Sequence, residues 1–264
     1  MRQNLLALAV AGFMGLTASI QAHADGELSG VSMCVYVEPT NAPFSFLEED
    51  LTKPLGLDVD IIYELQKRLG FSIQDERIYP LLRADQMERM RTGQADIIAG
   101  AMSRTDSRML FMDFSPVYYD TGVVVLHSKT HTPDIKGLDD LAGKTVLVTR
   151  GASFIDFVKR QQPEAKIVEI ANLTLGYFDV AQGKADALLY DHPIVDYFSR
   201  TMPGLNLEPV GELFDRKDSQ YVIGFRKDSP YTRYFLQEMR EMRQDGTLDR
   251  LKEKWHLQSS ASLY

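Results

Sequence analysis

The sequence lacks most of the side chains from which metal and catalytic centres are built. It has 264 residues and one cysteine, Cys34, so no disulfide can form within the chain. The five histidines stand at positions 23, 127, 131, 192 and 256, with no spacing typical of metal ligands. No Gly-x-Ser-x-Gly motif occurs. We therefore expect no metal, no cofactor and no catalytic residue.

A phosphate-binding loop is missing too. Residues 142–145 read Ala-Gly-Lys-Thr, like the end of such a loop, but the position that requires the first glycine holds Leu138. The segment also precedes an expected strand, whereas a phosphate-binding loop follows one. The sequence therefore does not predict a nucleotide site.

Long apolar runs are confined to the beginning of the chain. Arg2 is the only charged residue among the first 24, residues 5–16 are apolar, and Ala22-His23-Ala24 has the small-residue pattern of a cleavage site. We predict a signal peptide over residues 1–24, cleaved after Ala24. A membrane anchor is the less favoured alternative, because glycine and hydroxyl residues interrupt the run and no later stretch approaches about 20 apolar residues.

Excess positive charge is absent. Cleavage leaves 240 residues with 28 basic and 37 acidic side chains, a net charge of −9. A protein with this negative charge binds polyanions poorly, so we expect no nucleic-acid partner. Cys34 lies ten residues beyond the cleavage site, inside an apolar run, and is therefore a poor candidate for lipidation. An exported chain without lipid or disulfide is expected to be a soluble periplasmic protein, and we expect a monomer.

Strand and helix patterns alternate through the first part of the mature chain. Strands are predicted at 31–37, 71–73 and 95–99, and helices at 58–69 and 84–92, ending at Gly70 and Gly93. This order is typical of a parallel sheet covered by helices. The run 121–127 is β-rich and is followed by no helix.

A second alternating unit begins after residue 144. Strands are predicted at 145–149, 166–170 and 185–190, with helices at 154–162 and 174–182. A return strand is expected at 207–213 or 220–225, and then a helix at 231–243 and a last helix capped by Thr247. We predict two α/β lobes: residues 25–122 plus 217–264 form lobe 1, and residues 123–216 form lobe 2. The last two helices would pack on lobe 1.

The segment Gly100–Arg108, GAMSRTDSR, places hydroxyls and two arginines where the strand at 95–99 is expected to end. Ligands of open α/β sheets lie beyond the carboxyl ends of the strands. Ser103 offers a hydroxyl, Thr105 fits the N-cap of a following turn, and the Arg108 guanidinium matches a carboxylate. The segment is therefore either a carboxylate site or a solvated turn, and Arg104 is the more exposed of its arginines.

Two segments of the second unit offer complementary groups. Asp191 directly follows a predicted strand, where its carboxylate can bind an ammonium group or cap the helix that Pro193 begins. Gly151 permits a tight turn, and Ser153 can cap a helix or contact a ligand. His192 is expected at the surface. An α-amino acid carries the matching carboxylate and ammonium, and because neither lobe supplies both partners, its binding would favour closure of the lobes.

Six stretches, in this order, resemble one known family. They are NAPFSF (41–46), LGLDVDIIYELQKRLG (55–70), GQADIIAGAMSRTDSRMLFMDFSPVYYD (93–120), LAGKTVLVTRGASF (141–154), GKADALLYDHPIVDYF (183–198) and DGTLDRLKEKW (245–255). They make the chain similar to the periplasmic solute-binding proteins of polar amino-acid ABC transporters, bacterial solute-binding protein family 3. The resemblance implies an α/β fold of two lobes, the type 2 periplasmic binding protein fold, with a ligand cleft between the lobes and two crossover segments.

The resemblance also implies a role for each site residue. Arg108 would bind the α-carboxylate with help from Ser103 and the backbone near Ala101, Ser153 would add a hydrogen bond from lobe 2, and Asp191 would receive the α-ammonium. Glu38 falls where family members place an acid near the ligand side chain. Asn41 and Arg83 or Leu82 stand where relatives often carry aromatic residues that stack on the ligand. Glu38 suggests a cationic or amide ligand, whereas Arg83 would disfavour a cation.

The family resemblance implies an inner-membrane ABC permease as the partner. Two alternatives use the same scaffold. One is an enzyme similar to cyclohexadienyl dehydratases, with Glu38 as its general acid. The other is a ligand-binding receptor for a sensor kinase.

Overall fold

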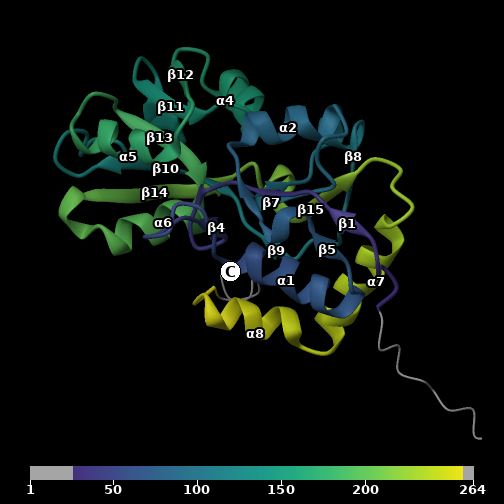
Figure 1. Cartoon of the computed structure of the whole chain (residues 1–264). Helices are drawn as coiled ribbons and strands as arrows, with labels where there is room; N and C mark the ends of the chain where they lie inside the picture. Colours follow the sequence, from purple (N-terminus) through teal and green to yellow (C-terminus); the bar gives the residue numbers. More distant parts are fainter. Residues whose placement is uncertain (1–25, 258–264) are drawn as a thin grey trace, which may run out of the picture.

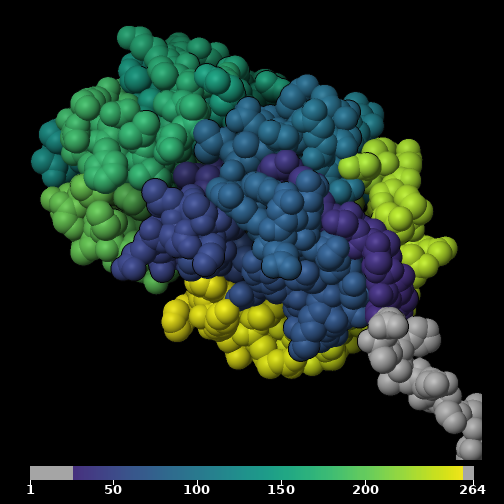
Figure 2. All heavy atoms as spheres, viewed as in Figure 1, coloured from purple at the N-terminus to yellow at the C-terminus, as the bar shows by residue number. Residues whose placement is uncertain are grey.

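The computed structural model describes residues 26–257, which form two α/β lobes side by side (Figure 1). The predicted signal peptide and its cleavage site lie outside the described residues. In Figure 2 the teal and green lobe packs against the blue lobe, whose lower side the yellow C-terminal helices cover. Among residues 26–257, no helix is both long and apolar enough to span a bilayer.

The first lobe is built on a six-stranded mixed sheet. Its strand order is β6-β2-β7-β15-β8, and β9 also pairs with β15. β2 is parallel to β6 and β7, whereas β15 is antiparallel to its neighbours. The strands are β2 (Val35–Val37), β6 (Tyr79–Pro80), β7 (Ile97–Ser103), β8 (Met112–Phe114), β9 (Tyr119–Asp120) and β15 (Gln220–Arg226). The expected parallel sheet thus receives an antiparallel strand from far along the chain.

Two small strand pairs and five helices complete this lobe. β1 (Ser32–Met33) pairs with β5 (Ser72–Ile73), and β3 (Thr40–Asn41) pairs with β4 (Ser45–Phe46). The helices are α1 (Leu57–Leu69), α2 (Arg83–Arg91), α3 (Asp106–Met109), α7 (Thr232–Gln244) and α8 (Thr247–Lys254). The apolar face of α1 is buried, and Gly70 ends this helix at φ 77°, a conformation that glycine adopts readily.

The second lobe carries a five-stranded sheet of order β12-β11-β13-β10-β14. Its strands are β10 (Val123–Ser128), β11 (Thr145–Thr149), β12 (Lys166–Ile170), β13 (Ala187–Asp191) and β14 (Leu207–Phe214). Its helices are α4 (Ile155–Gln161), α5 (Leu173–Ala181) and α6 (His192–Thr201). Both candidate return segments are strands, but only β15 lies in the first sheet. Short 3-10 helices cover Gln74–Glu76, Leu138–Leu141, Pro203–Leu205 and Arg216–Asp218.

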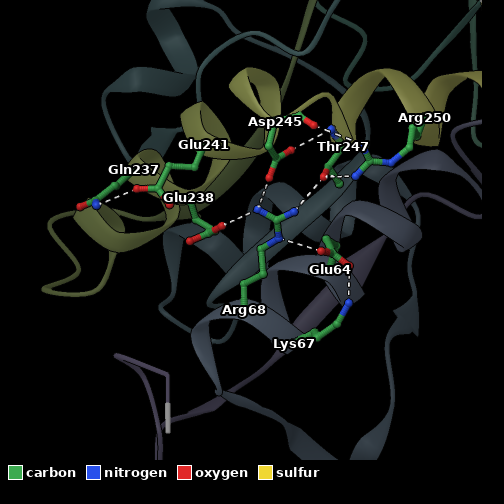
Figure 3. A network of polar contacts seen from close by, with 9 residues as sticks. All are labelled: Glu64, Lys67, Arg68, Gln237, Glu238, Glu241, Asp245, Thr247 and Arg250. Atoms are coloured by element: carbon green, nitrogen blue, oxygen red, sulfur yellow. Dashed lines mark hydrogen bonds and ion pairs between the residues drawn. The ribbon is translucent and has the colours of Figure 1, made fainter. Parts of the chain in front are cut away.

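A polar network fixes the two C-terminal helices to the first lobe (Figure 3). Arg68 of α1 donates to Glu238 at 3.0 Å, to Asp245 at 2.8 Å and to the Thr247 hydroxyl at 2.8 Å. Its Nε also donates to Glu64 on its own helix at 2.7 Å. Thr247 is therefore a member of this network and not the predicted N-cap of α8, a position that Gly246 occupies.

Candidate functional site

A cavity of about 140 Å³ lies between the lobes, beyond the carboxyl ends of β2, β7, β11 and β13. This volume suits on the order of five to ten water molecules, or a small organic ligand. Six of the seven residues predicted from the sequence contribute to its wall: Glu38, Ala101, Ser103, Arg108, Ser153 and Asp191. The exception is Asn41.

The part of the cavity wall that belongs to the first lobe begins within strand β7. β7 was expected to end at Ala99, but it continues to Ser103, which pairs with Tyr221 of β15. Two residues of the extension have positive φ, Gly100 at 101° and Ala101 at 55°. A Cβ at Gly100 would lie 2.7 Å from the Glu38 nitrogen, so only glycine fits there.

A buried carboxylate holds this unusual backbone in place. Asp58 of α1 is fully buried, and its Oδ2 accepts hydrogen bonds from the N–H groups of Gly100 at 2.7 Å and Ala101 at 2.9 Å. Its Oδ1 accepts a third bond from the Tyr118 hydroxyl at 2.6 Å. Burial raises the pKa of Asp58 to about 6, although these hydrogen bonds act in the opposite direction. The Ala101 N–H is thus already paired within the protein.

Arg108 reaches the cavity from α3, whereas Arg104 is exposed. Thr105 caps α3 as predicted and accepts a hydrogen bond from the Arg108 N–H at 3.3 Å. The Arg108 side chain is 7 % exposed and donates to the Ser103 carbonyl at 2.7 Å and to the Gly151 carbonyl of the second lobe at 2.9 Å. Burial lowers the pKa of Arg108 to about 9, and repulsion from Arg83 acts in the same direction.

Asp191 faces the same cavity from the end of β13. It occupies the N-cap position of α6, yet its side chain makes no capping hydrogen bond. The residue is 6 % exposed, and burial raises the pKa of its carboxyl to about 7, partly offset by the nearby Tyr221 hydroxyl and Arg108. A buried carboxyl without a capping role is free to receive a positively charged group.

The turn after β11 supplies the rest of the second wall. Gly151 has φ 80°, as the predicted tight turn requires. Ser153 does not cap a helix, because Phe154 holds the N-cap position of α4 and makes no side-chain cap. The Ser153 hydroxyl instead donates to the Asp218 carbonyl at 3.3 Å.

Glu38 and Arg83 both line the cavity on the side of the first lobe. Glu38 is 4 % exposed and accepts a hydrogen bond from the Thr40 hydroxyl at 2.9 Å. Burial raises the pKa of Glu38, and the positive charge of Arg83 is the largest opposing influence. Arg83 donates to Gln86 at 2.7 Å and contacts the Gly100 carbonyl. Leu82 and Arg83 were the two candidates for the second position at which relatives often carry a stacking aromatic residue. Both of them line the cavity.

Asn41 joins the lobes beside the cavity. Its Nδ2 donates to the Gly100 carbonyl at 2.8 Å, and its Oδ1 accepts a bond from the Tyr190 hydroxyl at 2.8 Å. The side chain is 1 % exposed. Its amide therefore connects β7 of the first lobe to β13 of the second.

Sequence reasoning missed the supporting roles of Asp58, Tyr118 and Tyr190. For Asp58 a signal existed, because an acid stands among apolar residues at the start of α1. Within residues 26–257, no group of three or more histidine, cysteine or acidic side chains could hold a metal ion. His192 is about half-buried beside Asp191 and does not line the cavity.

Three comparisons place the chain among known proteins. It is 29 % identical over 262 residues to the L-cystine-binding protein TcyJ of Escherichia coli, covering 96 % of this chain and 95 % of that one. It is 26 % identical to the arginine-binding extracellular protein ArtP of Bacillus subtilis, covering 95 % and 96 %. An ancestral arginine-binding protein bound to glutamine superposes with a TM-score of 0.78 at 28 % identity, covering 85 % of this chain and 97 % of that one.

The ancestral arginine-binding protein shares the two-lobe fold that the resemblance implied. The family model of the bacterial extracellular solute-binding proteins, family 3, matches residues 33–258, which include the whole cavity wall. The relatives given above are all named as binding proteins. The chain belongs to the bacterial extracellular solute-binding proteins, family 3.

Proposed function

We propose that this protein captures a polar amino acid between its lobes for uptake by an ABC transporter. The observation that carries the proposal is one cavity with buried Arg108 on one wall and buried Asp191 on the other. An α-amino acid presents a carboxylate and an ammonium on one carbon, which match these two groups. Neither wall alone satisfies both charges, so the bound ligand stabilises the closed arrangement.

Arg108 binds the α-carboxylate in this proposal, and Ser103 completes the anion site. The Ala101 N–H, which was predicted to help, already donates to Asp58, so Ala101 shapes the wall without donating to the ligand. Asp191 receives the α-ammonium, and Ser153 adds a hydrogen bond from the second lobe. Glu38 lies near the ligand side chain. Asn41, predicted as a ligand contact, contributes indirectly by holding the two walls together.

The relatives support the transport role through their ligands: two are named for cystine and arginine, and the ancestral arginine-binding protein is bound to glutamine. An inner-membrane permease is the proposed partner, and a periplasmic monomer cleaved after Ala24 is the proposed working form. Lobe 1 would comprise residues 25–122 and 217–264, and lobe 2 residues 123–216. The links between β9 and β10 and between β14 and β15 would then act as the hinge.

Calorimetric titration of protein that has been unfolded and refolded to remove carried-over ligand tests the proposal. We expect saturable binding of at least one L-amino acid with a stoichiometry of one, and no binding of its decarboxylated amine. A folded, ligand-free protein that binds none of the 20 standard amino acids or cystine contradicts the proposal.

A second candidate function is dehydration of a carboxylated substrate. It is favoured by two buried carboxyl groups in the cavity with raised pKa values, Glu38 and Asp191, because a general acid must hold its proton near neutral pH. Incubation with prephenate separates the two functions. Turnover that disappears in Glu38→Gln would favour the enzyme, and its absence together with amino-acid binding would favour the receptor.

A further inference from the structure

We infer that Arg83 is a specificity-determining residue and that the ligand is an amino acid whose side chain carries no net charge. The inference rests on the proposed function and narrows its ligand class. Glu38 alone would suit a cationic side chain, as of arginine or lysine, so the two residues make opposite demands. The structure resolves this conflict through the contacts each residue makes.

Arg83 is anchored in the cavity wall with its charge kept inside the site. Its guanidinium donates to the Gln86 side chain at 2.7 Å and to the carbonyls of Ala99 and Gly100 in β7. Gln86 is itself fully buried and donates to the Leu81 carbonyl at 2.8 Å, which fixes its orientation. Arg83 is therefore held by neutral partners, and none of these hydrogen bonds neutralises its charge.

Glu38 cannot act as an unopposed anion for a cationic ligand. Glu38 is 4 % exposed, its carboxyl accepts a hydrogen bond from the Thr40 hydroxyl, and burial raises its pKa. The field of Arg83 reaches both Glu38 and Asp191. A cationic side chain entering the cavity would therefore meet the charge of Arg83 at short range, in surroundings that screen it poorly.

The charged residues of the wall balance one another. Three are basic and three acidic: Arg83, Arg108, Arg150, Glu38, Asp85 and Asp191. Arg150 and Asp85 are exposed, so when Arg108 and Asp191 bind the ligand backbone, Glu38 and Arg83 remain as the less exposed charges, one of each sign. A net-neutral side chain preserves this balance, whereas a charge of either sign would leave a partly desolvated charge uncompensated.

Titration against matched amino acids tests the inference. L-citrulline and L-arginine have nearly the same shape and differ by one charge. L-glutamine and L-glutamate form a second pair of this kind. We expect the tightest ligand among the 20 standard amino acids, citrulline and cystine to be neutral. Arginine, lysine, glutamate and aspartate should each bind at least tenfold more weakly, since a tenfold ratio needs only about 1.4 kcal/mol. If a charged ligand binds with an affinity within tenfold of that of the best neutral ligand, the inference is wrong but the proposed function stands. If no ligand of the panel binds, both the inference and the proposed function are wrong.

Substitutions at position 83 separate charge from packing. Arg83→Gln and Arg83→Lys both lose the fork that holds the Gly100 carbonyl, but only Arg83→Lys keeps the charge. We expect the ratio of arginine affinity to best-neutral affinity to rise at least fivefold in Arg83→Gln and to stay within twofold in Arg83→Lys. Arg104→Gln, which removes an exposed charge outside the cavity, is the matched control. Equal ratios in Arg83→Gln and wild type would assign Arg83 a purely structural role and overturn the inference.

Discussion

The two walls of the cavity are built on different principles. On the first wall the polar groups already have partners within their own lobe: Asp58 accepts hydrogen bonds from the N–H groups of Gly100 and Ala101, and Arg108 donates to the Ser103 carbonyl. On the second wall Asp191 occupies a cap position without making a cap. The first wall is organised by contacts within its lobe, and the second holds an acid whose ionisation is opposed by burial.

This difference indicates that the two walls contribute to ligand binding in different ways. A site with fixed donors loses little conformational freedom when a carboxylate binds, so it provides affinity directly. A buried acid with a raised pKa makes affinity depend on pH and on the charge of the ligand. Substitutions on each wall test that difference.

Arg108→Ala should abolish measurable binding, because it removes the guanidinium from a desolvated ion pair. Such truncations cost about 2–5 kcal/mol, or roughly 30-fold to several thousand-fold in affinity. The melting temperature of the ligand-free protein should stay near that of wild type, since a buried charge disappears together with its hydrogen bonds. Calorimetry and thermal unfolding measure both effects. Arg104→Ala is the control, and near-normal affinity in Arg108→Ala would remove the anion site from this wall.

Asp191→Asn should weaken binding about 30-fold at pH 8, by removing the charge that receives the ammonium. In wild type the affinity should be constant above the pKa of about 7 and fall by up to tenfold per pH unit below it. The sign follows because the ligand binds the ionised carboxyl, which protonation removes. A series of titrations from pH 5.5 to 8 checks this. An equally steep pH dependence in Asp191→Asn would assign the titration to another group.

Asp58→Asn should weaken binding by about fivefold without touching the ligand. The substitution replaces charge-assisted hydrogen bonds to Gly100 and Ala101 by weaker neutral ones, a loss of about 1 kcal/mol. Titration at pH 8, where Asp58 is ionised in wild type, gives the largest contrast. Asp60→Asn, on the same helix but paired with Lys254 and Trp255, is the matched control. Unchanged affinity in Asp58→Asn would mean that the backbone of β7 holds its shape alone.

The raised pKa of Asp191 also affects the stability of the ligand-free protein. Stability should fall as the pH rises, whereas ligand affinity should rise with pH. A folded-state pKa of about 7, above the unfolded value of 3.8, gives a contribution that is complete below about pH 4 and lost as the pH rises through 7. The melting temperature of Asp191→Asn minus that of wild type should therefore increase from pH 5.5 to pH 8, by about 2–4 °C per kcal/mol. Thermal unfolding at the two pH values measures the difference. A difference in melting temperature that is the same at both pH values would show that ionisation of Asp191 does not destabilise the folded protein.

Arg68→Ala should have the smallest effect on affinity, within twofold of wild type, and a clear effect on stability. It leaves three carboxylates, Glu64, Glu238 and Asp245, without their shared partner (Figure 3). Because the network is partly exposed, we expect a loss of about 1–2 kcal/mol, or a melting temperature lower by several degrees. A large loss of affinity would show that the C-terminal helices influence the cavity.

Much of the fold could be anticipated from local patterns, whereas the cavity walls required the family resemblance as well, which alone suggested Glu38 and Ala101. β11 and β12 have the predicted bounds, and Thr105 caps α3 as its position predicted. The extension of β7 could not be foreseen, since it depends on Asp58, whose contact lies more than 40 residues away in the chain.

The roles of Thr247 and Asn41 were hidden for the same reason. Both residues have local propensities for caps and turns, but their partners come from distant segments: Arg68 for Thr247, and Gly100 and Tyr190 for Asn41. Long-range polar contacts of this kind leave no periodic signal in a single sequence.

The Asn41 amide has a consequence for how the receptor opens. Its two ends bind Gly100 and Tyr190, the chain neighbours of Ala101 and Asp191, so the amide links the two walls next to two of their lining residues. While both hydrogen bonds persist, we expect the walls to keep their spacing at this point when the lobes move apart elsewhere. A ligand would then meet Ala101 and Asp191 close to their final separation, and the rest of the two walls would close on it.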